Sequence, residues 1–123
     1  QLNTFLRSVD ICFAGLLDVP SFAYGSDSTK IYEYMKASRA VIHAIGNEES
    51  SVAKAGCGMR VAPENSQALA EEIQKLALLP PQDLADMGKR GLEYLQKSRN
   101  YDVLIQKWMR LFNVLDHEKR RTV

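Results

Sequence analysis

The chain has 123 residues, which is the size of a single domain with room for a hydrophobic core. Apolar residues make up 46% of it and charged residues 25%, an ordinary globular composition. The formal net charge is +1, so the overall charge gives no argument for nucleic acid as a partner. The sequence contains no apolar run long enough to cross a bilayer.

The first residues, 2–6, form a short amphipathic fragment that is typical of the end of a helix. We expect this helix to begin upstream, and residues 1–123 to form one partial domain. Cys12, in the apolar run that follows, and Cys57, between two glycines, are too few for a disulfide framework and have no metal-ligand spacing. We expect both thiols to be structural, and unpaired thiols suggest a reducing compartment.

Short apolar runs and helical patterns alternate in the first half of the chain. We expect buried strands over residues 9–14, 40–45 and 59–61, with helices over 29–36 and 48–54 between them. This alternation predicts an α/β fold with about three parallel strands and flanking helices. A doubly wound fold usually has about six strands, so the pattern indicates the second half of a Rossmann-like domain.

The rest of the chain is helical. Asn65 or Ser66 is the expected N-cap of the next helix, and Pro80 and Pro81 interrupt the helical pattern. The last helix begins at Asn100 and has an apolar stripe that must be buried against something. The stripe consists of Tyr101, Leu104, Ile105, Trp108, Leu111, Phe112 and Leu115.

A candidate anion site lies where the first predicted strand leads, through a long loop over residues 15–28, into the helix over 29–36. Asp27 or Ser28 is the expected N-cap, and a helix N-terminus offers free backbone N–H groups and a positive dipole. The segment Gly25, Ser26, Asp27, Ser28, Thr29 and Lys30 adds hydroxyls and one lysine, which suits a phosphate or diphosphate. The alternative is a well-capped helix with no ligand, and the spacing is not that of a P-loop.

Two further side chains could face a ligand at this edge. Glu33 follows within the first turns of the helix, and a carboxylate can accept from both hydroxyls of a ribose. The alternative for Glu33 is a solvated helix residue. His43, at the end of the second strand, could contact a ligand or could simply be packed. The sequence shows no Ser–His–Asp or Cys–His constellation, so catalytic residues are left unassigned.

Residues 28–35 (Ser-Thr-Lys-Ile-Tyr-Glu-Tyr-Met) and the strand after them resemble the donor-binding signature of glycosyltransferase family 4, which has the GT-B fold. Residues 56–65 (Gly-Cys-Gly-Met-Arg-Val-Ala-Pro-Glu-Asn) are similar to a glycine-rich turn of that family, and residues 87–91 (Met-Gly-Lys-Arg-Gly) match a later segment. The resemblance covers nearly the whole chain. It is closest to bacterial O-antigen and capsule transferases that move N-acetyl-fucosamine from UDP.

The resemblance implies roles for the residues of the candidate site. Glu33 would accept the ribose hydroxyls, and Ser28, Thr29 and Lys30 would meet the diphosphate. Gly25 stands where many members have a glutamate that approaches the donor sugar, with Ser26 or Asp27 as possible substitutes in this chain. Ser38 and Ala40 replace the usual glycine and proline, a change expected to affect the turn more than the ligand.

The resemblance also implies what the whole protein does. The intact enzyme would transfer a sugar from a nucleoside diphosphate, with UDP the expected carrier, to a polysaccharide or lipid-linked acceptor bound by an N-terminal domain outside these residues. No metal or cofactor is expected. The intact protein would lie in the cytoplasm, with peripheral contact at the inner face of the cytoplasmic membrane. In such proteins the last helix crosses onto the N-terminal domain, although its stripe could equally cover this domain's own core.

Two other classes of protein share parts of this pattern. A non-catalytic α/β module such as a phospho-receiver domain needs aspartates at the carboxyl ends of strands. Asp10, Asp18 and Asp27 lie near the first strand, but Asp10 begins that strand. A GT-B-type sugar-nucleotide epimerase would share the donor site, and its product would distinguish it from a transferase.

Overall fold

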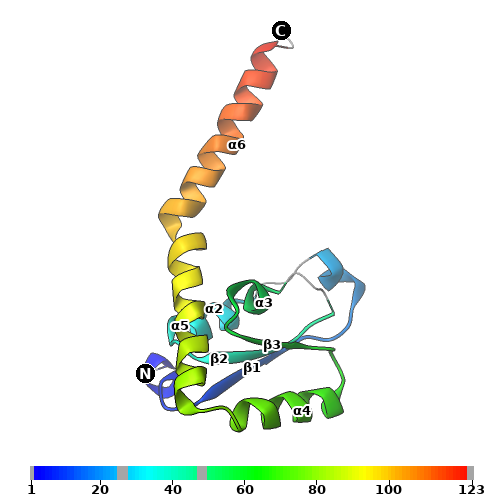
Figure 1. Cartoon of the computed structure of the whole chain (residues 1–123). Helices are drawn as coiled ribbons and strands as arrows, with labels where there is room; N and C mark the ends of the chain where they lie inside the picture. Colours follow the sequence, from blue (N-terminus) through cyan, green and yellow to red (C-terminus); the bar gives the residue numbers. More distant parts are fainter. Residues whose placement is uncertain (1, 25–27, 47–49, 122–123) are drawn as a thin grey trace.

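The computed structural model describes residues 2–24, 28–46 and 50–121 (Figure 1). Strands and helices alternate in its first half, and helices alone follow the third strand. The elements are α1 (Leu2–Leu6), β1 (Ile11–Gly15), a 3-10 turn (Pro20–Tyr24), α2 (Thr29–Lys36), β2 (Ala40–Ala44), α3 (Ser51–Ala55), β3 (Gly58–Val61), α4 (Ser66–Ala77), α5 (Pro81–Ser98) and α6 (Tyr101–Arg121).

The three strands form one parallel sheet in the order β1-β2-β3, as the alternation of the sequence predicts. Phe13 of β1 lies opposite Ile42 of β2, and His43 of β2 lies opposite Arg60 of β3. The central strand β2 is buried at all five positions, because helices cover both of its faces. The α/β class, the parallel sheet and the helical end are therefore confirmed.

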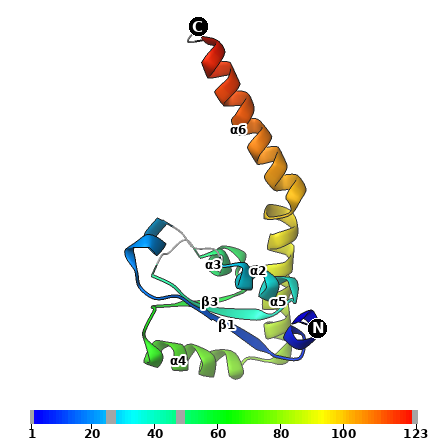
Figure 2. The same ribbon diagram turned by 180° about the vertical axis from the view of Figure 1, so that it is seen from behind.

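Side chains alternate between the two faces of the sheet, so each face builds its own core. Val41 packs on one side with Ile31 and Met35 of α2, while Ile42 packs on the other with Leu76 of α4. Figures 1 and 2 show the resulting layers, with α2 and α3 on one face of the sheet and α4 on the other. The long α5 contributes to both cores and holds the layers together.

Glycines in residues 56–65 and 87–91 allow α5 to pack closely against the sheet layer. A Cβ on Gly88 would lie 2.0 Å from the carbonyl oxygen of Ser38, and one on Gly91 would lie 3.0 Å from Cβ of Cys57. Gly56 ends α3 in the left-handed conformation, and Arg90 donates from Nε to its carbonyl oxygen at 2.7 Å. The two motifs therefore meet in space and fix α5 in place.

A serine occupies the left-handed position of the turn between α2 and β2. Ser38 has a φ of +57°, and the amide of Arg39 donates to the carbonyl of Tyr34 at 3.1 Å, which together close the end of α2. This is a Schellman-type C-cap, in which glycine is favoured because a Cβ is strained at positive φ. Ser38 is therefore a turn residue that closes the end of α2.

Replacing Ser38 by glycine will stabilise the protein by roughly 0.5–1 kcal/mol, because relief of the left-handed strain exceeds the extra flexibility of the unfolded chain. Urea unfolding followed by circular dichroism measures the change. Lys36→Gly, two residues earlier in regular helix, is the matched control and will destabilise by about as much. A Ser38→Gly variant that is less stable than the parent would contradict the strain at residue 38.

The last helix, α6, leaves the α/β body and extends away from it (Figures 1 and 2). The seven apolar residues of its predicted stripe, called here the α6 stripe, do not cover the domain's own core: Tyr101 is 85% exposed and Trp108 58%. The stripe therefore does not pack on this domain's own core, and its packing on an N-terminal domain stays a prediction. Among the described residues, no helix has both the length and the apolarity that a transmembrane span requires.

Candidate functional site

The candidate site lies at the N-terminus of α2, beyond the carboxyl end of β1. Ser28 is the N-cap, with extended φ and ψ of −69° and 136°, and its Oγ accepts a hydrogen bond from the amide of Lys30 at 3.3 Å. Its carbonyl also accepts from the amide of Ile31 at 3.0 Å. Of the two expected N-caps, Asp27 and Ser28, the structure has Ser28, and α2 begins and ends at the predicted residues. The structure therefore has the helix terminus that an anion site requires.

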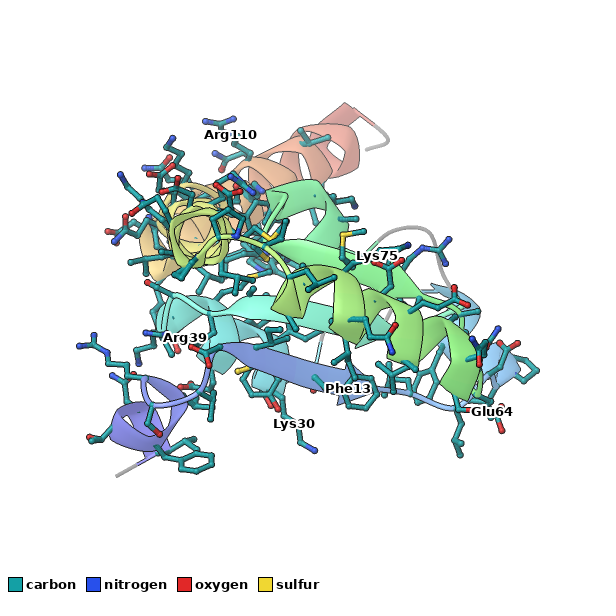
Figure 3. The ribbon with its side chains drawn as sticks, turned by 60° about the horizontal axis from the view of Figure 1, so that its bottom comes forward. Phe13, Lys30, Arg39, Glu64, Lys75 and Arg110 are labelled. Atoms are coloured by element: carbon teal, nitrogen blue, oxygen red, sulfur yellow. The ribbon has the colours of Figure 1, made fainter. Side chains whose placement is uncertain are left out.

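The other residues predicted for the anion site fall into two groups. Gly25, Ser26 and Asp27 lie outside the described residues. Thr29 and Lys30 are exposed in the first turn of α2, and the Lys30 side chain points away from the sheet into open space (Figure 3). Neither side chain is part of the packed core, so both are available to a ligand.

Glu33 lies one helical turn after Thr29, so the two side chains share a face of α2. Glu33 is half-buried, and its carboxylate has no hydrogen bond or ion pair within the described parts of the chain. It lines a groove of about 560 Å³ between α2, α5 and the start of α6. The residues lining this groove are Tyr32, Glu33, Lys36, Leu92, Leu95, Gln96, Arg99, Asn100, Tyr101 and Leu104.

The groove contains two cations that the sequence reasoning missed. Lys36 lies three residues after Glu33 on α2, and the Arg99 guanidinium stands over the Tyr32 ring, 5.8 Å from its centroid. Lys30 is not among the lining residues, because it lies about 60° from Glu33 around α2 on the side opposite to Lys36. Spacing along α2 could have indicated Lys36, but no local signal links Arg99 to a helix so distant in sequence.

His43 belongs to the core and not to the site. It is fully buried, and its Nδ1 lies 2.9 Å from the Oγ of Ser50, which precedes α3. This interaction occupies the Ser50 hydroxyl, and Ser50 accordingly makes no side-chain hydrogen bond as the N-cap of α3. Of the two interpretations of His43, the packed one is confirmed.

Asp10 and Asp18 do not come together in the structure, and Asp27 lies outside the described residues. Asp10 precedes β1 and lines a depression with Arg39 at the amino ends of the strands. Asp18 lies beyond the opposite end of β1, where its amide donates to the Glu64 carboxylate at 3.3 Å. In the described part of the chain, no group of three or more His, Cys, Asp or Glu residues could hold a metal ion.

Both cysteine thiols are buried and behave as small apolar side chains. Burial raises the pKa of the Cys57 thiol from 9.0 to about 11, and burial likewise raises the pKa of Cys12. A thiol with a raised pKa is a poor nucleophile at neutral pH. The expectation that both are structural agrees with this environment.

No protein-family model, curated protein or solved structure matches this chain. The fold is therefore described by its own geometry, as an α/β unit with a three-stranded parallel sheet, flanking helices and a helical end. This geometry agrees with one half of a Rossmann-like domain.

Proposed function

We propose that the chain is the donor-binding part of a GT-B glycosyltransferase and holds a nucleoside-diphosphate sugar, UDP-linked, at the N-terminus of α2. One observation carries the proposal: the Glu33 carboxylate lines a groove one turn from that terminus and has no partner among the described residues. The resemblance of residues 28–35 to the donor-binding signature of glycosyltransferase family 4 supports the same assignment.

The proposed contacts follow from the chemistry of each group. The diphosphate lies against the first turn of α2, where the helix dipole, the Thr29 hydroxyl and the Lys30 ammonium favour negative charge. The ribose hydroxyls donate to the Glu33 carboxylate, which lies on the same face as Thr29. Gly25, Ser26 and Asp27, which precede this turn in the sequence, are assigned to the donor-sugar side of the site.

The proposed reaction breaks the bond between the sugar and the diphosphate, and negative charge develops on the departing UDP. The positive end of α2 and Lys30 stabilise that charge, which is the role that a divalent ion has in other enzymes. Acceptor and catalytic base are assigned to a domain outside these residues, and the 123 residues alone are expected to bind donor without turnover. A polysaccharide or lipid-linked acceptor and a place at the inner face of the cytoplasmic membrane rest on the resemblance alone.

Titration calorimetry of the chain with UDP, UMP and uridine tests this assignment. We expect affinity to fall in that order, because each lost phosphate removes charge from the helix terminus. Lys30→Ala will weaken UDP but leave uridine unchanged, and Lys89→Ala on the exposed side of α5 will change neither. Uridine binding as tightly as UDP would contradict a diphosphate site at α2.

A further inference from the structure

The described part of the chain leaves the α6 stripe exposed except at Leu104, which is half-buried and lines the groove between α2 and α5. Ile105 and Phe112 are each 57% exposed, and Trp108 and Phe112 stack on each other with ring centroids 6.0 Å apart. The seven stripe residues cover about 120° of the helix surface, since consecutive residues are about 100° apart. An exposed stripe of this extent is typical of an interaction surface.

The stripe is symmetric along the helix about Trp108. Its members lie three, four and seven residues before Trp108 and three, four and seven residues after it. An antiparallel second copy of α6, related by a two-fold axis beside Trp108, would therefore place apolar residues opposite apolar residues throughout. Tyr101 would face Leu115 of the second copy, Leu104 would face Phe112, and Ile105 would face Leu111.

We propose that two copies of this chain associate through their α6 stripes in this antiparallel arrangement. Such an interface is isologous, because each copy contributes the same surface. The charges permit it: Lys107 lies level with Met109 of the second copy and Arg110 with Gln106, so like charges do not meet. The proposal is independent of the nucleotide site.

The area available is sufficient for a specific dimer. A free aromatic side chain presents on the order of 150–250 Å² of surface, and three of the stripe residues are aromatic. Pairing two stripes would bury on the order of 1,000 Å², the lower bound for a specific interface.

The position of the groove favours a helix over a bilayer as the partner that covers the α6 stripe. Tyr101 and Leu104 begin the stripe and line the same groove as Glu33 and Lys36, so this end of the stripe faces α2. A flat bilayer that covered it would also have to cover the Glu33 and Lys36 charges. Beyond this end, α6 stands clear of the body, which leaves room for a second helix alongside it (Figure 1).

Analytical ultracentrifugation of the chain tests the dimer. We expect a species of twice the 13.9 kDa chain mass at micromolar concentration. Phe112→Glu will weaken association by roughly thirtyfold or more, the effect expected when a central aromatic anchor is lost. Asn113→Glu, on the polar face of the same helix, is the matched control and will leave the dimer intact. Circular dichroism will show equal folding of both variants, because the stripe is not part of the domain core.

Cysteine cross-linking tests the direction of the helices. Trp108→Cys will form a disulfide-linked dimer under mild oxidation, because residue 108 faces itself across the two-fold axis. Tyr101→Cys will not, because its counterpart is residue 115 of the second copy. The native Cys12 and Cys57 are buried and give little background. Efficient cross-linking of Tyr101→Cys to itself would overturn the antiparallel arrangement.

Two other results would overturn the proposal altogether. One is a chain that remains monomeric to the highest soluble concentration, which would leave the stripe to another domain. The other is a monomer whose Trp108 fluorescence shifts to the blue only with vesicles of phosphatidylglycerol and phosphatidylcholine. Trp108 is the only tryptophan in the chain, so its emission reports on the stripe directly.

Discussion

Replacing Gly88 by alanine will lower the free energy of unfolding by at least about 3 kcal/mol, the upper end of the effect of overpacking. The new Cβ would lie 2.0 Å from the carbonyl oxygen and 2.4 Å from the carbonyl carbon of Ser38, both backbone atoms. The turn at Ser38 cannot yield without opening the C-cap of α2, so α5 must move away from the sheet. Thermal unfolding measures the loss, which corresponds to a fall in the melting temperature of roughly 10 °C or more.

Gly15 provides the matched control, because the atoms nearest to it belong to a side chain and not to the backbone. The three atoms nearest to a Cβ on Gly15 all belong to the ring of Phe13, the first of them 2.8 Å away, and this exposed side chain can rotate. Gly15→Ala will therefore change stability by less than about 1 kcal/mol. Equal effects of the two substitutions would contradict the close contact between α5 and the Ser38 turn.

Replacing Glu33 by glutamine will lower the affinity for UDP by roughly 10- to 100-fold. A hydrogen bond to a charged group contributes about 1.5–3 kcal/mol, and the amide keeps the size of the side chain but removes its charge. The groove beside Glu33 remains, so the fold should be unaffected. Calorimetric titration of both proteins with UDP measures the difference.

Two controls test whether the loss of UDP affinity comes from the ribose hydroxyls. Glu93→Gln changes another half-buried helical glutamate, on α5, and will leave the affinity for UDP unchanged. The dideoxyribose analogue of UDP lacks both hydroxyls, so it will bind the parent and the Glu33→Gln variant equally. If Glu33→Gln weakened that analogue as much as UDP itself, Glu33 would not be the ribose ligand.

Local sequence signals predicted most of the α/β unit. The apolar run around Val41 indicated a strand because a parallel strand covered on both faces needs continuous apolar side chains. The apolar run around Cys12 also indicated a strand, although only alternate residues of β1 are buried. Ser28 indicated the start of α2 because a serine oxygen at that position satisfies a free helix amide. These features depend on neighbours within a few residues, which is the range over which sequence patterns carry information.

Contacts between distant elements could not be predicted in this way. Arg99 approaches Tyr32 only because α5 packs against α2, and Gly88 meets Ser38 for the same reason. The 3-10 turn at Pro20–Tyr24 was also missed, since its loop residues have no periodicity. The helix that carries the stripe was predicted from its spacing, but the exposure of the stripe depends on the direction in which α6 leaves the body.

Amide-shift mapping by NMR of the isotope-labelled chain during titration with UDP tests the donor-site assignment most directly. We expect the shifts to concentrate on residues 26–33 and the adjoining groove, and to disappear in Glu33→Ala. Shifts that map instead to the depression beside Asp10 and Arg39, or that persist unchanged in Glu33→Ala, would contradict a nucleotide-sugar site at the N-terminus of α2.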